Sequence, residues 1–380
     1  MIRTATAPPP ARTDPAPAPA GTALLVPAAD AAAVAAALAE VELRLDRFFA
    51  EALARSARHS PRYRQLWWAV RSATQGGKRL RPRLVLAAYL HLGGTRLEPA
   101  VELAVAVELL HTALLLHDDV IDGDVERRGV PNLVGTLASA ARAEGLSEAA
   151  ARRWGEHAAI LAGDLLLTSA LRLTSGLPVD PARRAQVVEL VDEAVFRAAA
   201  GELADVAYAA GLETPSAGAI VEMMADKTAH YSLELPLRGA AILAGAPERL
   251  GDRLGAIGRS LGIVFQMRDD VLGVFGRTEE TGKSASNDLR EGKQTLLVAF
   301  ARGTAAWTAT GDLFGRPDLD EEQVQQLRDA LESSGARRRF EEEIRREQDT
   351  VLSLIRGARL PGGLAAMLAG EAIRAAERRS

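Results

Sequence analysis

Three aspartates end an apolar stretch of the chain: Asp118, Asp119 and Asp122 follow Leu114-Leu115-Leu116-His117. Asp118 and Asp122 are four residues apart, so on a helix they share one face and lie one turn apart. Carboxylates crowded at the end of an apolar helix repel one another and lose solvation unless a cation lies beside them. All-oxygen ligands suit magnesium better than zinc. The segment therefore predicts a magnesium site, and the alternative is a solvated acidic helix end.

A second acidic pair, Asp269 and Asp270, follows another apolar stretch, Leu254–Phe265. If both acidic segments lie at the polar ends of buried helices, they can face each other across a cavity. Magnesium ions held between them would bind a diphosphate group. The alternative for this pair is two ordinary aspartates near a helix end.

Lysine and arginine side chains accompany these carboxylates. Two glycines precede three cations in the motif GGKRLRP at 76–82, and Arg127-Arg128-Gly129 follows the first acidic segment. Phosphoryl oxygens are bound by arginine forks and lysine ammonium groups. GGKRLRP does not match the phosphate-binding pattern GxxxxGK[ST]. Any one of these cations alone is typical of a solvated surface, but their joint placement indicates a diphosphate site; the further candidates are Lys227, Thr228, Lys283 and Lys293.

A diphosphate site at the mouth of a deep apolar pocket fits one kind of chemistry, the ionisation of an allylic diphosphate. Magnesium and the cations stabilise the departing diphosphate. The apolar walls keep water away from the carbocation.

The elements that must position these residues are helices. Apolar residues recur at three- and four-residue spacing from about Ala23 to Ser380, without alternating β-type runs. Breaks at glycine and proline leave roughly ten to twelve helices. Arg83–Leu92 and Leu97–Leu116 are apolar around most of their circumference, as expected at the centre of a large bundle. We expect one all-α domain over 23–380 and a disordered Pro/Ala-rich tail over 1–22.

The composition excludes several other classes of protein. The 380 residues carry a net charge of −4, which provides no basic field for nucleic acid. Cysteine is absent, which excludes disulfides, thiol catalysis and thiolate metal sites; we expect a cytoplasmic protein. The apolar run Leu103–Leu116 is too short to span a membrane and contains Glu108 and His111. The N-terminal segment lacks the continuous apolar core of a signal peptide.

Five ordered motifs give the chain a family resemblance: GGKRLRP, HDDVID followed by RRG, DKT, FQMRDD and GKSASNDLREGK. They resemble those of the trans-isoprenyl diphosphate synthase (polyprenyl synthetase) family, in particular its geranylgeranyl diphosphate synthases. The resemblance covers about 300 residues, from Gly76 to the C-terminal helices. It implies an isoprenoid synthase bundle around a deep central apolar cavity, assembled as a homodimer. It also implies head-to-tail condensation of isopentenyl diphosphate with an allylic diphosphate.

The resemblance also implies roles for individual residues. The released diphosphate is the expected base, so no general base on the protein is implied. The central part in catalysis falls to Asp118, Asp122, Asp269, Lys227 and Arg127. The implied metal ligands, for three magnesium ions with manganese as a substitute, are Asp118, Asp119, Asp122, Asp269 and Asp270. The implied isopentenyl diphosphate ligands are Lys78, Arg81, His111 and Arg128, and those of the allylic substrate are Arg127, Lys227, Thr228, Gln266, Lys283 and Lys293.

The chain departs from the family pattern at two positions. The second motif often reads DDxxD, but its last position here is Gly273, and Asn287 stands where some relatives have an acid. We expect activity to be retained, because Asp269 and Asp270 remain.

Product length in this family depends on the helix before the first motif. Ala113 and Leu114 precede Asp118 by five and four residues, and neither is aromatic. An isoprene unit of about 5 Å is close to the helical pitch of about 5.4 Å, so a small residue at 113 leaves room for one more unit, with Leu110 as the next floor. This favours geranylgeranyl diphosphate, and the alternatives are a farnesyl or a longer polyprenyl product.

Other functions fit the sequence less well. A class I terpene cyclase would carry a different second motif and would not need GGKRLRP. A non-catalytic subunit of a heteromeric synthase is suggested by Gly273, but such a subunit would be expected to lose the first motif, which is intact. A squalene- or phytoene-type coupling enzyme would show two DxxxD motifs.

Overall fold

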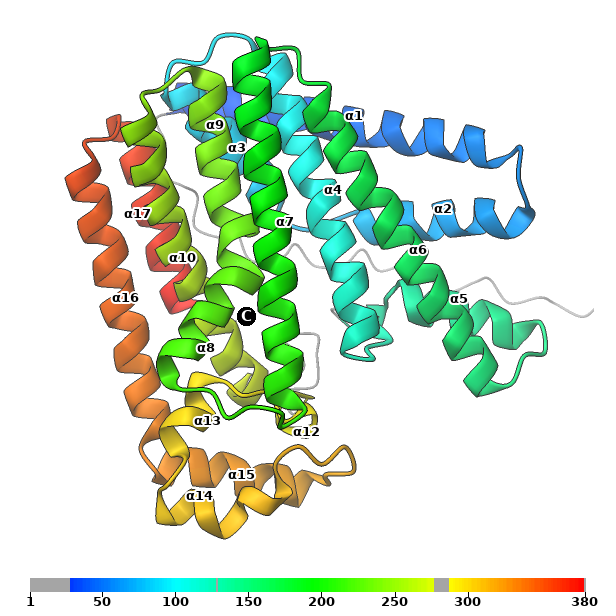
Figure 1. Ribbon diagram of the computed structural model, residues 1–380, viewed down its shortest axis with the longest axis vertical. Helices are drawn as coiled ribbons and strands as arrows, with labels where there is room; N and C mark the ends of the chain where they lie inside the picture. Colours follow the sequence, from blue (N-terminus) through cyan, green and yellow to red (C-terminus); the bar gives the residue numbers. More distant parts are fainter. Residues whose placement is uncertain (1–27, 128, 277–286, 379–380) are drawn as a thin grey trace, which may run out of the picture.

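Helices form nearly all the regular structure of the chain (Figure 1). The computed structural model describes residues 28–127, 129–276 and 287–378. Within these ranges the strands are β1 (Glu126–Arg127) and β2 (Val130–Pro131), which pair antiparallel. The predicted all-α fold is confirmed. The tail expected over 1–22 lies outside the described residues.

The helices follow the chain in a simple order. Those of the first half are α1 (Ala28–Ser56), α2 (Pro61–Thr74), α3 (Leu80–His91), α4 (Leu97–Ile121), α5 (Leu133–Ala143), α6 (Glu148–Ser175) and α7 (Pro181–Ala209). Those of the second half are α8 (Ala217–Met224), the π-helix η1 (Ala225–Glu234), α9 (Leu235–Ala244), α10 (Glu248–Phe275), α12 (Asn287–Glu291), α13 (Leu296–Ala301), α14 (Ala305–Thr310), the 3₁₀ helix η2 (Gly311–Leu313), α15 (Glu321–Ser333), α16 (Ala336–Ala358) and α17 (Gly362–Glu377).

Helix α4 is the central helix, as its sequence predicts. It packs against α1, α3, α5, α6, α9 and η1, and Leu103, Leu109 and Leu110 are fully buried. An apolar helix with neighbours on all sides belongs to the core of a large bundle. Its polar C-terminal end therefore carries the first acidic motif out of the core and toward the site.

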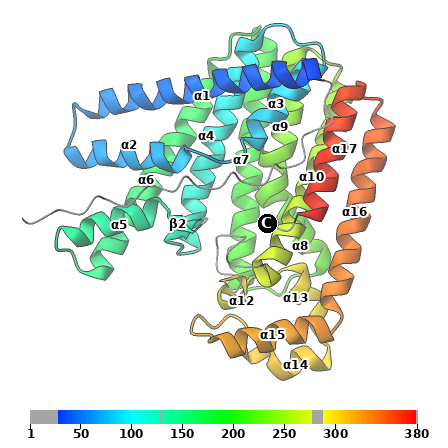
Figure 2. The same cartoon turned by 180° about the vertical axis from the view of Figure 1, so that it is seen from behind.

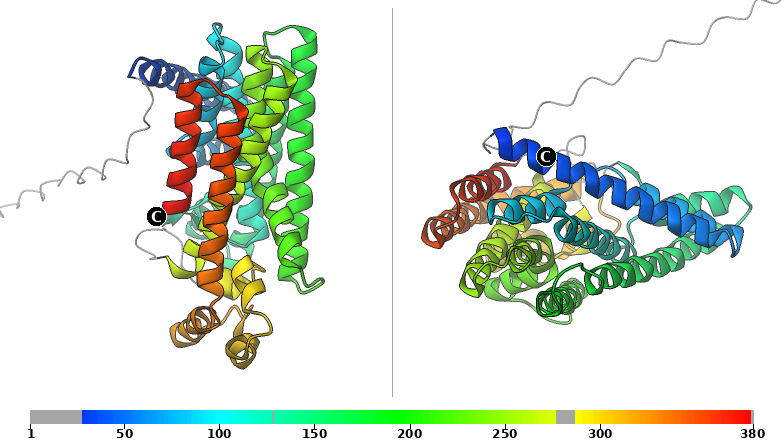
Figure 3. Two further views of the ribbon diagram at one scale, coloured as in Figure 1. Left: turned by 90° about the vertical axis from the view of Figure 1, so that its left-hand side faces the viewer. Right: turned by 90° about the horizontal axis from the view of Figure 1, so that it is seen from above.

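A second group of helices lies beside α4. Helix α10 packs against η1, α9, α16 and α17, while α7 packs against the other side of η1 (Figures 1 and 2). The π-helix thus stands between α7 and α10. Seen from the side and from above, α16 and α17 run next to each other, and α1 crosses one end of the bundle (Figure 3). The two acidic motifs come from α4 and α10, in the two halves of the bundle.

Helices α4 and α6 are both long and apolar enough, by length and composition, to cross a membrane. For α4 the explanation is burial, because 78% of its most apolar window is inside the protein. For α6 that share is 39%, and Leu161 is 59% exposed. Helix α6 therefore presents apolar side chains that the described residues leave exposed.

Candidate active site

Lys227 of η1 is the centre of a polar cluster that joins three helices. Its Nζ lies 2.7 Å from Asp205 Oδ2 and 3.1 Å from Glu202, both on α7, and 3.5 Å from Asp118 Oδ1 on α4. The close approach of α7 to η1 depends on Gly201, where a Cβ atom would lie 2.2 Å from the backbone nitrogen of Lys227. Only glycine fits there, and it lets Glu202 and Asp205 reach the ammonium group.

The charges of this cluster are unequal. Burial works against the ammonium group, but Asp118, Asp205 and Glu202 together outweigh it and raise the pKa of Lys227 well above its ordinary range. Burial raises the pKa of Glu202 to about 7; attraction by Lys227 opposes this shift and repulsion by Asp118 adds to it. Three carboxylates share one ammonium group, so the lysine is strongly stabilised as a cation. Glu202 is left incompletely compensated as an anion.

Three carboxylates converge close enough to hold a metal ion. Asp118, Asp122 and Glu202 each offer one oxygen, and these oxygens lie within 4.8 Å of one another. An all-carboxylate set fits a hard divalent cation such as magnesium. The incomplete compensation of Glu202 points the same way, because a bound cation would stabilise its ionised form.

Asp119 faces away from this set and holds Arg127 instead. Its Oδ1 accepts hydrogen bonds from Arg127 Nε at 2.9 Å and from Nη2 at 2.6 Å, and Nη2 also lies 3.0 Å from Asp118 Oδ2. The ribbon of β1 and β2 brings Arg127 back over the end of α4. Burial opposes the charge on Arg127, but Asp119 and Asp118 outweigh it and raise the pKa of the guanidinium. Asp119 thereby fixes a cation next to the carboxylates.

Lys293, 171 residues after Asp122, contacts the last aspartate of the first motif. Its Nζ lies 2.8 Å from Asp122 Oδ2 and 3.2 Å from Glu291 Oε2. Burial raises the pKa of Glu291 to about 7, with attraction by Lys293 acting against it. Lys293, predicted as a ligand of the allylic substrate, thus lies beside the first acidic motif.

The second acidic motif lies on α10. Asp270 is buried and its Oδ1 accepts a hydrogen bond from Gln266 Nε2 at 2.9 Å, while Thr228 Oγ1 donates to Gln266 Oε1 at 3.1 Å. Burial raises the pKa of Asp270 well above its ordinary range. Asp269 points elsewhere, and its Oδ1 accepts a hydrogen bond from Arg378 Nη1 at 2.8 Å. The structure thus brings Thr228, Gln266 and Asp270 into one chain of contacts.

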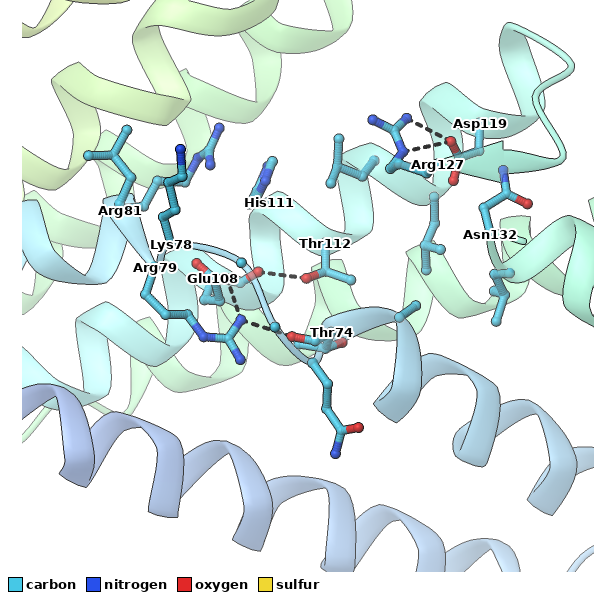
Figure 4. A pocket seen from close by; sticks show the side chains of 18 of the residues that line it. Thr74, Lys78, Arg79, Arg81, Glu108, His111, Thr112, Asp119, Arg127 and Asn132 are labelled. Carbon is cyan, nitrogen blue, oxygen red and sulfur yellow. Dashed lines mark hydrogen bonds and ion pairs between the residues drawn. The ribbon is translucent and has the colours of Figure 1, made fainter. Parts of the chain in front are cut away.

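A cavity of about 1510 Å³ lies beside the first motif. Lys78, Arg81, His111 and Arg127 are among the residues that line it, and Figure 4 shows them around one space. Arg81 is tied to η1, because its Nη2 donates to Ser232 Oγ at 2.6 Å. This cavity brings together three of the four residues predicted to bind isopentenyl diphosphate.

Tyr231 lies between two residues that line the cavity, His111 and Arg81. Its hydroxyl is 3.4 Å from His111 Nδ1, and the guanidinium of Arg81 lies 5.3 Å from the centre of its ring. A π-helix repeats its backbone hydrogen bonds at five residues, and such segments are frequent at functional sites. Here the π-helix carries Lys227 and Thr228 toward the acidic motifs and Tyr231 toward the cavity.

Arg79, the middle cation of GGKRLRP, has a different place. It donates to Glu108 Oε1 at 2.7 Å and to the carbonyl of Thr74 at 2.8 Å (Figure 4). It also donates to Glu42 Oε1 at 2.6 Å. The side chain is only 11% exposed. It ties the loop to α1 and α4, and Arg79 lines the cavity together with Lys78 and Arg81.

The residues predicted to set product length lie on other faces of α4. Ala113 and Leu110 are fully buried in the core and Leu114 is half-buried. They are absent from the lining of the cavity just described. Their role stays a prediction. Two predicted substrate ligands, Arg128 and Lys283, lie outside the described residues.

Several site residues were not predicted from the sequence. Glu202 and Asp205 are three residues apart and follow Gly201, a pattern that marks one face of a helix. That spacing was an available signal, although it is shared by many solvated helices. The others are Tyr231, Ser232, Glu291 and Arg378.

Comparison with known proteins identifies the family. The family model of polyprenyl synthetases matches residues 66–331. A geranylfarnesyl diphosphate synthase of Aeropyrum pernix is 34% identical over 69% of this chain and 77% of its own length. A (2E,6E)-farnesyl diphosphate synthase of Mycobacterium tuberculosis is 31% identical over 77% of each chain.

A solved structure agrees with these matches. The geranylgeranyl pyrophosphate synthase of Corynebacterium glutamicum, complexed with isoprenyl diphosphate and magnesium, superposes with a TM-score of 0.83 at 29% identity. The match covers 89% of this chain and 98% of that one. From the matched family, the shared motifs and the common fold, the chain belongs to the polyprenyl synthetase family and is a trans-prenyltransferase.

Proposed function

We propose that this prenyltransferase condenses isopentenyl diphosphate with an allylic diphosphate, head to tail, and that its main product is geranylgeranyl diphosphate. The observation that carries the proposal is the oxygen cluster of Asp118, Asp122 and Glu202 beside a large cavity lined by Lys78 and Arg81. Relatives of this chain are named for farnesyl, geranylgeranyl and geranylfarnesyl diphosphate. Geranylgeranyl diphosphate is the middle product of these three.

Magnesium is the proposed metal, with Asp118 and Asp122 of the first motif, Glu202 of α7 and Asp269 of α10 as its ligands. When bound, magnesium neutralises charge on the departing diphosphate. A count of three ions per site, with Asp119 and Asp270 in supporting positions, is part of the same proposal. Two similar structures support the metal dependence, one solved with magnesium and one, a polyprenyl synthase of Caulobacter crescentus, with calcium.

The protein's cations have two successive partners in this mechanism. In the structure Lys227, Arg127 and Lys293 bind carboxylates of the first motif. If a metal ion were held by those carboxylates, Lys227, Arg127 and Lys293 would be available to bind the diphosphate oxygens. The allylic C–O bond then breaks and its electron pair leaves with the diphosphate. The double bond of isopentenyl diphosphate attacks the carbocation, and the released diphosphate accepts the proton that leaves.

Product length is proposed to depend on Ala113 and Leu114, with Leu110 below them. A small side chain at 113 leaves about one helical turn of extra depth, close to the length of one isoprene unit. The proposal therefore expects elongation past fifteen carbons.

We also propose that the protein is a homodimer that uses one face of α6 and α7. On α7, Phe196 and Leu203 are 73% and 71% exposed and lie seven residues apart, hence on one side of the helix. On α6, Trp154 and Leu161 have the same spacing and are also exposed. The two helices pack together (Figure 1), and we propose that these exposed side chains form one broad apolar face. Exposed apolar patches of this kind mark interaction sites.

Light scattering after size-exclusion chromatography tests the dimer. Phe196→Glu and Leu203→Glu are expected to give a monomer, whereas Leu43→Glu, at an exposed apolar position on α1, is expected to leave the dimer intact. A wild-type protein that elutes as a monomer would contradict the proposal. A cytoplasmic location is proposed as well, supported by the absence of cysteine.

The reaction is tested by incubating the protein with magnesium, isopentenyl diphosphate and, separately, dimethylallyl, geranyl or farnesyl diphosphate. The dephosphorylated products are sized by chromatography, and Asp118→Ala serves as the inactive control. A dominant twenty-carbon alcohol is expected. A product that stops at fifteen carbons would refute the argument from Ala113 alone. Elongation of none of the starters would refute the substrate assignment and return the non-catalytic subunit to consideration.

A further inference from the structure

Arg79, the residue directly before α3, has an unusual backbone conformation. Its φ and ψ angles are 46° and 43°, in the left-handed region that favours glycine. It stands at the N-cap position, where serine, threonine, aspartate, asparagine or glycine is preferred, and its side chain makes no capping hydrogen bond. A residue strained in this way persists only where surrounding contacts hold it. The reason for an arginine at this position therefore lies in what its side chain binds.

Two carboxylates from separate helices hold the side chain of Arg79. Its Nη1 donates to Glu108 Oε1 of α4 at 2.7 Å, and its Nε donates to Glu42 Oε1 of α1 at 2.6 Å. Glu108 is buried, so its charge depends on this partner. Burial opposes the charge on Arg79, but the hydrogen bonds with Glu42 and Glu108 outweigh it and raise the pKa of the guanidinium. The contacts of this arginine therefore join α1, α4 and the start of α3.

The residues on either side of this anchor line the cavity. Lys78 directly precedes Arg79 and Arg81 follows it by two residues, and both are expected ligands of isopentenyl diphosphate. Glu108 lies three residues before His111, hence on the same face of α4, and His111 lines the same cavity (Figure 4). The ion pair between Arg79 and Glu108 therefore fixes the loop against the face of α4 that carries another expected ligand.

We propose that Arg79 is a positioning residue for isopentenyl diphosphate. Glu42 and Glu108 hold its side chain, and its left-handed backbone turns the chain so that Lys78 and Arg81 both face the diphosphate. The inference rests on the proposed condensation reaction, in which isopentenyl diphosphate is a substrate.

The alternative is that Arg79 binds the diphosphate directly, because it also lines the cavity. The two roles give opposite expectations for the carboxylates. If Arg79 positions its neighbours, neutralising Glu42 or Glu108 loosens the loop and weakens the binding of isopentenyl diphosphate. If Arg79 is a ligand, neutralising either carboxylate releases the guanidinium and strengthens that binding.

The test uses four variants of the anchor and its partners: Arg79→Lys, Arg79→Gly, Glu108→Gln and Glu42→Gln. Three quantities are measured on the full chain: the KM for isopentenyl diphosphate with the best allylic starter at saturation, the KM for that starter, and the Tm. Arg44→Lys is the matched control, because Arg44 also joins α1 to α4, through Glu40 and Glu102, but lies outside the loop. Glu42 is exposed, so Glu42→Gln tests the link even if a variant at a buried position fails to fold.

Arg79→Lys is expected to raise the KM for isopentenyl diphosphate by about tenfold or more, because an ammonium group cannot replace the planar fork that fixes the loop. Arg79→Gly should have the same effect although glycine suits the backbone angles, since both carboxylate contacts are lost. Glu108→Gln and Glu42→Gln should raise this KM by about threefold, because an amide oxygen accepts a weaker hydrogen bond than a carboxylate. In all four variants the KM for the allylic starter should stay within about twofold of wild type. Arg44→Lys should leave both KM values unchanged.

Each other outcome contradicts the proposal. If the two glutamine variants lower the KM for isopentenyl diphosphate or leave it unchanged, while Arg79→Lys raises it, Arg79 is a ligand of the diphosphate. If Arg79→Lys and Arg79→Gly lower the Tm and change neither KM, Arg79 serves folding alone. If both KM values rise together, or if Arg44→Lys gives the same increase, the effect is not specific to this loop. Wild type that elongates no allylic starter would refute the proposed reaction and this inference with it, whereas an active wild type with unchanged variants would refute this inference alone.

Discussion

The two acidic motifs, one at the end of α4 and one on α10, each place carboxylates at the edge of an apolar helix. Their negative charges are compensated in different ways. At α4 the charges are balanced by Arg127, a few residues further along the chain, and by two distant cations, Lys227 and Lys293. On α10 Asp270 is buried against an amide, and Asp269 pairs with an arginine at the end of α17. The first motif is thus compensated from within the core, and the second at its margin.

The difference in burial shows what each arrangement can do. Lys227 is 19% exposed and its partners Glu202 and Asp205 are 21% and 13% exposed, so their interactions are only weakly screened. Arg378 and Asp269 are 34% and 38% exposed, and a pair of this kind contributes little to stability. We infer that the first motif is held ready in the unliganded protein, whereas the second takes its working form when metal and diphosphate bind.

Removing one cation from each motif gives the largest expected contrast. Lys227→Met is expected to lower the free energy of unfolding by about 3 kcal/mol or more, because it leaves Asp118, Glu202 and Asp205 without their shared ammonium group. It should also reduce turnover by about 100-fold or more, since a charged group at the diphosphate is lost. Arg378→Met, at the second motif, should change stability by less than about 1 kcal/mol. Urea unfolding followed by circular dichroism measures the stability of both variants, and a steady-state assay measures the turnover of Lys227→Met. Equal losses of stability in the two variants would show that the two motifs do not differ.

The raised pKa of Glu202, which lies on α7 beside the first motif, makes the stability of the metal-free protein depend on pH. Between the ordinary glutamate pKa of about 4.5 and the folded value of about 7, the folded protein binds more protons at Glu202 than the unfolded chain does. The contribution of this group to stability is therefore complete below the lower value and is lost as the pH rises toward the upper one. In the metal-free protein, Glu202→Gln should remove about 1–3 kcal/mol of that decline between pH 5 and pH 8.

Urea unfolding of wild type and variant at pH 5, 6, 7 and 8 tests this dependence. Glu189→Gln, at an exposed position of the same helix, should unfold in parallel with wild type throughout. Saturating magnesium with pyrophosphate should flatten the wild-type curve, because a bound cation favours the ionised carboxylate. Parallel curves for wild type and Glu202→Gln would mean that Glu202 is compensated by Lys227 after all.

Some residues of this site can be predicted from the sequence and others cannot, and the difference is whether local spacing marks them. The aspartates of both motifs and the cations of GGKRLRP are recognisable because local spacing carries them, and the family, the fold and the enzyme class that they predicted are confirmed. Glu202 and Asp205 are not recognisable in this way, since an acidic pair three residues apart is common on solvated helices. Their role depends on Gly201, which brings α7 against η1, and a close approach of two helices leaves no local pattern.

The contacts of the second motif with the rest of the chain are even harder to predict from the sequence. Arg378 is 109 residues away from Asp269, and nothing near either residue marks the pair. Gly273 was recognised as a departure from the family pattern, but the sequence did not indicate that the carboxylate of Asp288 lies beside it. This proximity is visible only where two elements meet, because the distance from position 273 to the carboxylate of Asp288 is set by the packing of α12 on α10.

The smallest expected effect concerns Arg378 itself. In the structure its guanidinium holds Asp269 and lies 5.3 Å from the ring centre of Phe265, so a metal ion that binds Asp269 must displace it. Arg378→Ala is therefore expected to lower the half-saturating magnesium concentration by about two- to fivefold, the range that corresponds to a partly exposed ion pair. Arg374→Ala, one turn earlier on α17, removes the same charge from a residue that pairs with Glu371 and should leave the magnesium requirement unchanged. A magnesium requirement that rises in Arg378→Ala would reverse the interpretation, because the arginine would then be helping the metal–diphosphate complex to bind, and the second motif would be assembled with its cation in place, as the first one is.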